Sequence, residues 1–279
     1  MLDIRKRITL IQSLVDEDTD QSLTYAALEC RLTLEYICYE RFKLSHSYLS
    51  PADLKHWRPR DVVKQVSEEA NELIAQEFTL SVSASAPREN TVEGFQELEY
   101  TEVGTQAPIR LNKLHSIWNA LSNVALHMPV PTIATSELSI YGDREKIREK
   151  VRDVLSLLPS MEGSLLMGGH LGKVFSFICQ TCEIEVRRPE KFLEAVSVAS
   201  CINPECYESY RLELGEDGEV SVNRRTFDFK CDECENILQI PVNVFSKMRF
   251  QQQLNVTCCN CQNTKQLLMR PVARLTVDN

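Results

Sequence analysis

Eight cysteines between residues 179 and 261 are the side chains of this sequence whose type and spacing best suit chemistry. They form two sets of four, Cys179-x2-Cys182 with Cys201-x4-Cys206, and Cys231-x2-Cys234 with Cys258-x2-Cys261. A Cys-x2-Cys turn directs two thiolates at one point, and a second turn of this kind closes a tetrahedral site of four sulfur ligands, which suits zinc. The spacing therefore predicts two zinc ribbons in tandem.

The two sets belong to an internal repeat with an offset of 52 residues. The repeated residues are Phe175, Phe177, Cys179, Cys182 and Pro189, which recur as Phe227, Phe229, Cys231, Cys234 and Pro241. Chance would give about one identity over so short a span, so the five matches indicate a true repeat. Phe177 and Phe229 hold the same place in each copy, which predicts that they pack over the metal sites and do not stack on bases.

Two other interpretations of the cysteines are weaker. Disulfides need an oxidising compartment, and we expect no secretory signal in the first 18 positions, because polar and charged residues interrupt any apolar core there. Iron–sulfur clusters use the same ligands, but their binding motifs are usually denser in cysteine. Four protein thiolates leave no position for a water molecule, so the two predicted zinc ions are structural and take no part in hydrolysis. Cys259 is predicted to be a spare thiol, because Cys258 and Cys261 repeat the spacing of the other Cys-x2-Cys pairs.

The composition is that of an ordinary soluble globular protein. The chain has 279 residues, of which 43% are hydrophobic and 25% charged, enough for about two domains. No stretch approaches the ~18 apolar residues of a membrane span, so we expect a cytoplasmic protein with no membrane contact. Residues 171–279 hold 13 basic and 15 acidic residues, so most of the net charge of −9 lies in the first 170 residues. Neither half forms the broad basic surface that binds nucleic acid nonspecifically.

The first half of the chain has the periodicity of helices. Apolar residues recur at helical spacing over residues 3–15, 22–43, 60–73 and 111–126, and a charged helix is predicted at 143–158. Cys30 and Cys38 lie on the apolar stripe of the second helix, so we expect them in the core and not among the ligands.

A short alternating pattern interrupts the helices. Residues 78–84 and 97–103 alternate and predict a small β-hairpin insertion joined by a polar loop. The predicted fold class is α+β, an N-terminal helical bundle with this hairpin, followed by tandem β-rich ribbons. The predicted segments are the bundle at 1–130, a linker with the charged helix at 131–170, the first ribbon at 171–222 and the second at 223–279.

Two helices of the N-terminal half resemble those of a known family. YAALECRLTLEYICYERF, residues 25–42, combines an alanine- and leucine-rich stripe with an arginine and a glutamate; LHSIWNALSNVALHMPVP, residues 114–131, ends in a leucine–histidine–proline-like segment. They are similar to the opening and closing helices of HEPN-like domains, over roughly residues 5–130. The resemblance implies a bundle of four or five helices that is often dimeric. The family includes RNases of toxin–antitoxin and antiviral defence systems, and many members that have lost catalysis.

The same resemblance implies a candidate catalytic pair. Catalytic HEPN-like proteins carry Arg-x4–6-His at the start of the closing helix, where this chain has Arg110 and His115. The histidine would act as general base or acid and the arginine would bind the scissile phosphate. About one such match is expected by chance, Arg41 and His46 form another, and Leu111 stands where the family usually has a polar residue.

His127, at the end of the closing helix, has two interpretations. It would either join Arg31 and Glu35 in a polar pocket between the two helices or simply favour the negative end of the helix dipole. The second arrangement is the commoner one for a histidine at a helix C-terminus.

Four arginines of the ribbons are candidates for contact with nucleic acid or an acidic partner. They are Arg187, Arg188, Arg224 and Arg225. An exposed ribbon strand would present them to a phosphate or a carboxylate, whereas the plainer interpretation is a solvated strand face.

These observations favour a non-enzymatic zinc-ribbon adaptor, of a prokaryotic defence or toxin–antitoxin-like system. We expect it to contact a protein partner or nucleic acid, RNA or DNA, and the helical domain to be able to form a homodimer. The alternative is a metal-independent HEPN-type endoribonuclease that uses Arg110 and His115. A DNA-binding regulator is a third hypothesis, disfavoured by the acidic charge and the lack of a recognition helix.

Overall fold

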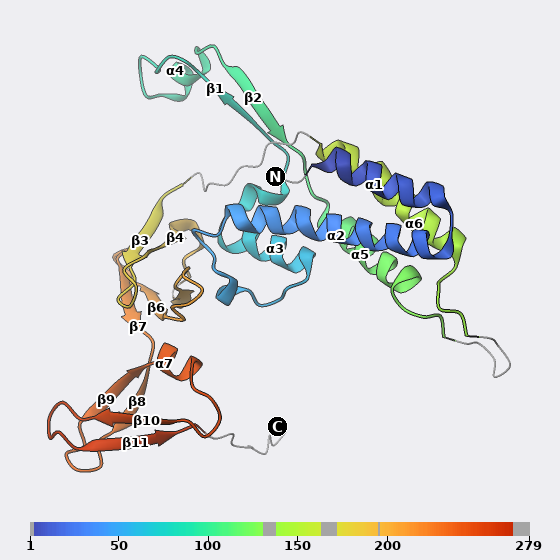
Figure 1. Cartoon of the computed structure of the whole chain (residues 1–279). Helices are drawn as coiled ribbons and strands as arrows, with labels where there is room; N and C mark the ends of the chain where they lie inside the picture. The colour runs from blue at the N-terminus through green and yellow to red at the C-terminus, as the bar shows by residue number, and fades with distance from the viewer. Residues whose placement is uncertain (1–2, 131–137, 163–171, 195, 270–279) are drawn as a thin grey trace, which may run out of the picture. The chain divides into compact units, whose positions relative to one another are not determined.

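The computed structural model describes residues 3–130, 138–162, 172–194 and 196–269 (Figure 1). The chain divides into two compact units, residues 1–46 with 54–171 and residues 47–53 with 172–279. The first, the helical unit, is mostly α-helix, and the second, the ribbon unit, consists mainly of short antiparallel strands. The predicted α+β class is therefore confirmed.

The helical unit is organised around one long helix. Its elements are α1 (Ile4–Glu17), α2 (Asp20–Leu44), α3 (Pro59–Glu69), the 3-10 turn η2 (Glu72–Ala75), α4 (Val92–Gln96), α5 (Leu111–Ala125), α6 (Arg144–Leu157) and the 3-10 turn η3 (Leu158–Met161). The residues between α1 and α2 form caps: Asp18 ends α1 in the left-handed conformation, and Thr19 caps α2 reciprocally with Ser22. None of the described helices combines the length and apolarity that a bilayer crossing requires.

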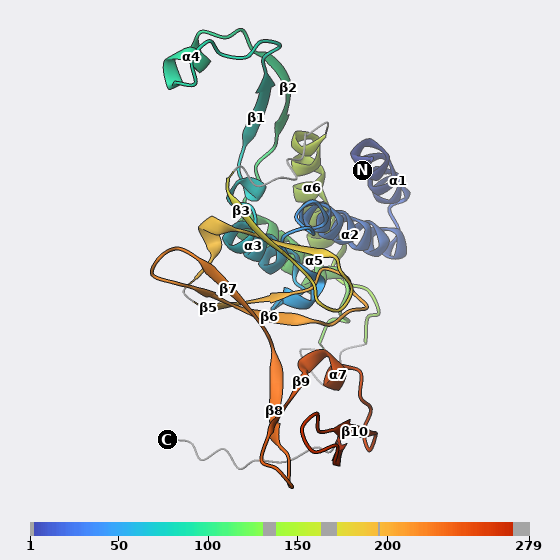
Figure 2. The ribbon, with the colours of Figure 1, turned by 90° about the vertical axis from the view of Figure 1, so that its left-hand side faces the viewer.

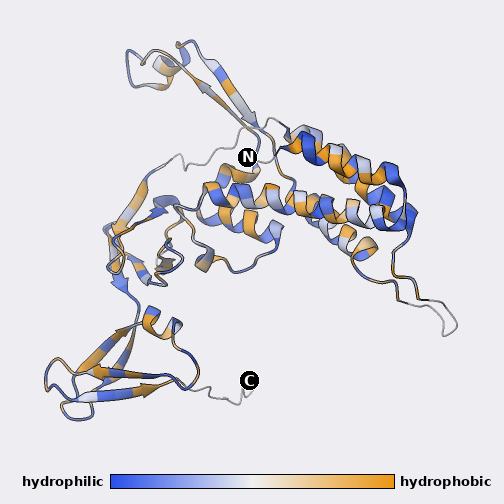
Figure 3. Cartoon of the chain, viewed as in Figure 1, coloured by the Kyte–Doolittle hydropathy of each residue, from blue (hydrophilic) through white to orange (hydrophobic). Residues whose placement is uncertain are grey.

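The apolar stripe of α2 forms the core of this unit. Helices α1, α3, α5 and α6 all pack against α2, and apolar and hydrophilic residues alternate around the helices (Figure 3). Leu23, Cys30, Leu34 and Cys38 have no exposed surface. Burial raises the pKa of both Cys30 and Cys38 to about 12, so these thiols are inert core residues, as the sequence indicates.

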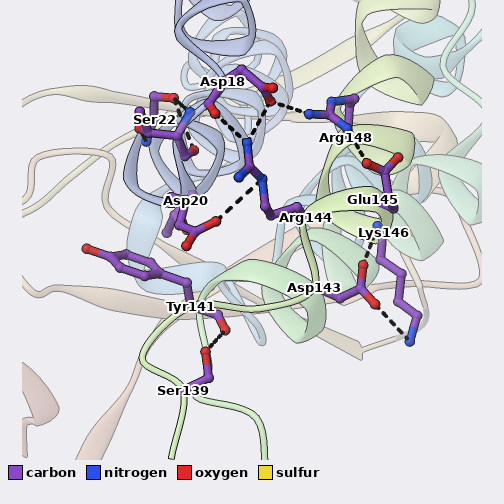
Figure 4. A network of polar contacts seen from close by, with 12 residues as sticks. Asp18, Asp20, Ser22, Ser139, Tyr141, Asp143, Arg144, Glu145, Lys146 and Arg148 are labelled. Atoms are coloured by element: carbon purple, nitrogen blue, oxygen red, sulfur yellow. Dashed lines mark hydrogen bonds and ion pairs between the residues drawn. The ribbon is translucent and has the colours of Figure 1, made fainter.

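The charged helix α6 belongs to the helical unit and not to a linker. Ile147, Val151 and Val154 are buried, and α6 packs against α2 and α5. Its polar side is tied to the turn between α1 and α2, where Asp18 accepts hydrogen bonds from Arg144 and Arg148 (Figure 4). Within the predicted linker, residues 131–137 and 163–170 lie outside the described residues.

The predicted hairpin is present and forms an arm, residues 78–106. Strands β1 (Phe78–Val82) and β2 (Thr101–Gln106) pair antiparallel, and the hairpin extends away from the helices of its own unit (Figures 1 and 2). The connection, predicted to be a polar loop, contains α4, whose first turn is capped by Thr91. Gln106 anchors the base of the arm through hydrogen bonds to the carbonyls of Leu73 and Gln76.

The ribbon unit contains the predicted tandem repeat. Its elements are η1 (Pro51–Asp53), β3 (Val174–Ile178), β4 (Glu185–Pro189), η4 (Glu190–Phe192), β5 (Val196–Ser200), β6 (Ser209–Leu214), β7 (Val220–Arg224), β8 (Thr226–Lys230), β9 (Ile237–Pro241), α7 (Val242–Ser246), β10 (Gln253–Thr257) and β11 (Thr264–Leu268). The β3–β4 and β8–β9 hairpins have equivalent bounds and register 52 residues apart. The second half of the first ribbon has three strands, β5–β6–β7 (Figure 2), whereas that of the second ribbon has two.

Candidate metal centres

Each cysteine pair sits on a turn whose backbone is left-handed at the residue after the second cysteine. These residues are Glu183, Tyr207, Glu235 and Gln262, with φ between 56° and 61°. In the first turn the N–H of Glu183 donates to the carbonyl of Cys179 (2.9 Å), and the N–H of Cys179 donates to the carbonyl of Ile184 (3.0 Å). The two turns of the second ribbon repeat these bonds. The backbone thereby fixes where both sulfur atoms of a pair point.

The first centre brings together the four cysteines predicted for it. The ligand atoms of Cys179, Cys182, Cys201 and Cys206 lie within 4.8 Å of one another. The Sγ atoms are 3.7 Å apart for Cys179 and Cys206, and 3.5 Å apart for Cys182 and Cys201. Tetrahedral coordination with metal–sulfur bonds of about 2.3 Å requires edges of about 3.8 Å. The spacing is therefore that of four ligands around one ion.

The second centre has the same arrangement. Cys231, Cys234, Cys258 and Cys261 form the second group, with Sγ atoms 3.5 Å apart for Cys231 and Cys261 and 3.6 Å apart for Cys234 and Cys258. Cys259 is exposed and lies outside the group, in agreement with its predicted spare role. With four thiolates at each centre, a bound ion has no open position for a water molecule or substrate.

A tyrosine supports the first centre. The hydroxyl group of Tyr210, which is fully buried, donates to Cys179 Sγ (3.3 Å) and accepts from the N–H of Gln180 (2.7 Å). Burial would raise the pKa of the Cys179 thiol, but hydrogen bonds from Tyr210 and the backbone N–H of Thr181 lower it to about 7. Phe177 packs edge-on against Tyr210, which confirms its predicted packing role.

The second centre has a smaller core and depends on backbone donors. Its buried residues are Cys231, Leu238 and Cys258, with Phe229 packed against them as predicted. The backbone N–H groups of Cys261 and Asn260 lower the pKa of the Cys258 thiol to about 6. A thiolate at this position is thus favoured near neutral pH by the turn itself.

The four candidate arginines of the ribbons differ in their surroundings. Arg187 pairs with Glu185 on the exposed face of its hairpin. Arg188 is buried and pairs with Asp53, and Arg224 pairs with the fully buried Glu208. The guanidinium of Arg225 has no carboxylate partner among the described residues; it lines a pocket instead.

The two residues of the candidate catalytic pair do not both line the pocket at the start of α5. Arg110 is the exposed N-cap residue of α5 and lines an apolar pocket of about 230 Å³ together with Lys113 and Leu157. His115 is half-buried, is not among the lining residues of that pocket, and its Nε2 lies 3.0 Å from Nδ2 of Asn119. A helix places residues five apart on different sides, which accounts for this separation.

Arg31 and Glu35 form an ion pair on α2 where it faces α5, but His127, which one of its two interpretations places beside them, is exposed. Arg31 lies over the Trp118 ring, 4.1 Å from its centroid, and donates to Ser122 (2.9 Å). Glu35 accepts from the Trp118 indole N–H (2.8 Å). These polar contacts of Trp118 could not be predicted from the sequence, because a tryptophan on an apolar stripe is expected to pack in the core.

The buried carboxylates of the ribbon unit were also missed. Glu208 accepts from Thr181 (2.7 Å) and Arg224, and these bonds outweigh burial and lower its pKa. Asp53 lies in η1, far along the sequence from the ribbons that it belongs to. No local sequence pattern marks either residue.

Comparison of the chain with protein-family models, curated proteins and solved structures finds no match.

Proposed function

We propose that this chain is a non-enzymatic adaptor whose two cysteine centres hold structural Zn²⁺ and whose arm binds a protein partner. Zinc is the ion best suited to four thiolates in tetrahedral array. The small cores of the ribbons need such an ion, because short β-rich segments bury too little apolar surface to fold alone.

The observation that carries the adaptor function is the exposed apolar surface of the arm. Five large apolar side chains of this 29-residue hairpin are 44–69% exposed, namely Val82, Val92, Phe95, Tyr100 and Val103. Apolar residues occur among hydrophilic ones along the arm in Figure 3. Apolar side chains gathered on one projecting element are typical of a surface that another protein covers.

The charge of the arm favours a basic protein partner. Residues 78–106 contain five glutamates and a single arginine, Arg88. Carboxylates around apolar side chains attract a surface that presents lysine or arginine beside apolar residues, and they repel the phosphates of nucleic acid. The apolar side chains would supply affinity and the carboxylates orientation.

Peptides of contrasting chemistry test this proposal by fluorescence anisotropy. The panel contains an alternating lysine–leucine peptide, its glutamate–leucine counterpart and a lysine–serine peptide, with single-stranded RNA as a fourth probe. We expect the lysine–leucine peptide to bind most tightly. The double variant Phe95→Ser with Val103→Ser should weaken the binding of this peptide at least about tenfold, since each substitution deletes a large apolar contact.

A matched control separates the arm from the rest of the surface. Leu10 of α1 and Leu32 of α2 are 40% and 45% exposed, so Leu10→Ser with Leu32→Ser removes similar apolar surface elsewhere on the helical unit. Equal weakening by the two double variants, or preference for the glutamate–leucine peptide or RNA, would contradict the assignment of the arm.

A further inference from the structure

A second candidate binding site lies in the ribbon unit. A pocket of about 440 Å³ is bordered by the turn of Cys201, by α7 and by η1 with the residue before it. Its polar lining residues include Ser50, Ser200, Ser209, Ser246, Tyr207 and Arg225, and none of its lining residues is acidic. The volume is within the range of small-molecule sites.

Arg225 gives this pocket its charge. The other three candidate arginines of the ribbons are each neutralised by a carboxylate. Within the described part of the chain, the guanidinium of Arg225 has a hydrogen bond to a neutral group, Ser209 Oγ at 3.5 Å, and no ion pair, while the Arg225 backbone is held by hydrogen bonds to Ser209 and Val242. An arginine with a fixed backbone and with guanidinium N–H donors available suits a phosphate or carboxylate group.

An aromatic ring, that of Tyr207, lines the same pocket. Tyr207 is 52% exposed, and its backbone is held in the left-handed conformation by the metal turn (φ 58°). Lys247 Nζ lies 5.3 Å from the centroid of the ring and donates to the carbonyl of Glu205 (2.8 Å), which adds a second positive charge next to the pocket. An exposed ring beside a cation suits a planar aromatic ligand that carries negative charge.

We propose that this pocket binds a nucleotide, with its phosphate on Arg225 and the serine hydroxyls and its base against Tyr207. The ligand is either a free nucleotide or the phosphorylated end of a single strand, because both present the same chemistry. The site does not depend on the arm, so an adaptor would hold a basic protein at one element and a nucleotide at the other.

A competing role for Arg225 is to balance the charge of the neighbouring metal centre. Four thiolates and a divalent ion carry a net charge of about −2, and Cys201 borders the pocket. In that case, loss of Arg225 would loosen the metal and would not affect nucleotides. Metal content must therefore be measured beside binding.

Calorimetric titration of the full chain, as purified with its metal, tests the site. The probes are inorganic phosphate, 5′-AMP, adenosine, phosphotyrosine, and a short single-stranded RNA with and without a 5′-phosphate. We expect 5′-AMP to bind with a Kd below about 1 mM. Its affinity should be higher than those of phosphate, adenosine and phosphotyrosine. If the natural ligand is the end of a strand, the 5′-phosphorylated RNA will bind more tightly than 5′-AMP. If the natural ligand is a free nucleotide, 5′-AMP will bind more tightly than the RNA.

Three variants assign the roles of the residues. Arg225→Gln should weaken the binding of 5′-AMP about tenfold or more, because a charged hydrogen bond is lost. Arg187→Gln should leave this binding unchanged. Ser246→Asp, at an exposed position, should abolish binding through charge repulsion. Tyr207→Asn, which keeps a residue that tolerates the left-handed backbone, should reduce the preference for 5′-AMP over phosphate.

Four outcomes would overturn the proposal. These are no binding of 5′-AMP to the wild type, equal weakening by Arg225→Gln and Arg187→Gln, a preference for phosphotyrosine, or a weakening in Arg225→Gln that is accompanied by loss of metal.

Discussion

The carboxylate of Asp53 and the guanidinium of Arg188 form an ion pair of 2.9 Å, with side chains only 9% and 10% exposed. Asp53 also accepts from the N–H of Ser200 (3.1 Å) and from both the N–H and the hydroxyl of Ser50. Asp53→Ala would remove this carboxylate from beside a nearly buried guanidinium, so we expect the ribbon unit to lose about 3–5 kcal/mol of unfolding free energy. Denaturant unfolding monitored by metal release measures this loss.

A neighbouring pair provides the control for this prediction. Glu185 and Arg187 lie on the same hairpin, but their side chains are 39% and 46% exposed. Glu185→Ala should therefore change stability little. In addition, Asp53→Ala combined with Arg188→Met should recover part of the loss. Equal effects of Asp53→Ala and Glu185→Ala would show that the buried pair is not important for stability.

Tyr210→Phe should weaken metal binding at the first centre only. The substitution keeps the ring packed against Phe177 but removes the hydroxyl that donates to Cys179 Sγ. Loss of a hydrogen bond to a metal ligand typically costs 10- to 100-fold in metal affinity, about the size expected here. In competition with a chromophoric chelator, the variant should therefore release one ion at a lower chelator concentration than the wild type does, and the other ion at the same concentration. Early release of both ions, or of neither, would contradict the role of Tyr210.

The ligands could be predicted from sequence because each pair is local. Two or four residues separate the cysteines of each turn, and the repeat confirms the register. The Asp53–Arg188 pair joins residues 135 positions apart, so nothing in either local sequence announces it. Prediction from sequence failed where a contact depends on how distant segments fold together.

Short elements were also hard to predict. Helix α4 has five residues, one of them Gly94, and only the Thr91 cap marked its start. The apolar spacing of α6 was recognised, but periodicity cannot tell whether a helix joins a bundle or stands in a linker. That distinction came from burial of Val151 and Val154 in the structure.

Cys258 and Cys259 are adjacent but should differ in metal binding. Cys258 is fully buried in the second group, whereas Cys259 is exposed and outside it. The wild type should contain two zinc ions per chain, Cys259→Ser should keep both, and Cys258→Ser should lose one and unfold the second ribbon. Elemental analysis counts the ions and identifies the metal. Iron in place of zinc, or loss of an ion in Cys259→Ser, would refute the assignment.

Asp18→Asn should weaken the attachment of α6 in a way that depends on pH. Arg148, and after it Arg144, hold the pKa of the Asp18 carboxyl below its ordinary value of 3.8. A lowered folded-state pKa means that the contribution is complete above pH 3.8 and is lost as the pH falls through the lowered value. Asparagine tolerates the left-handed backbone of this position, so the substitution tests the charge alone.

The measurement is thermal unfolding of the helical unit by circular dichroism. The wild type should be slightly more stable than Asp18→Asn at neutral pH and equal to it in strong acid. Because these groups are exposed, about 1 M salt should also remove the difference. A difference that persists in acid and in salt would mean that Asp18 acts by packing and not by charge.

The adaptor and the endoribonuclease hypotheses differ in whether the chain cleaves RNA. We expect the purified chain to leave RNA uncut, because Arg110 lines an apolar pocket that His115 does not border, and His115 is bonded to Asn119. If the chain is a metal-independent RNase, cleavage will resist a brief exposure to chelator, since no metal takes part. Arg110→Ala and His115→Ala will then each lower the cleavage rate by a factor on the order of 10² to 10⁴.

His46→Ala is the matched control, because His46 belongs to the other Arg-x4-His match in the sequence and packs against Phe42. Cleavage that His115→Ala abolishes and His46→Ala retains would replace the adaptor by the enzyme. Cleavage retained in both variants would indicate a contaminating nuclease and leave the adaptor proposal in place.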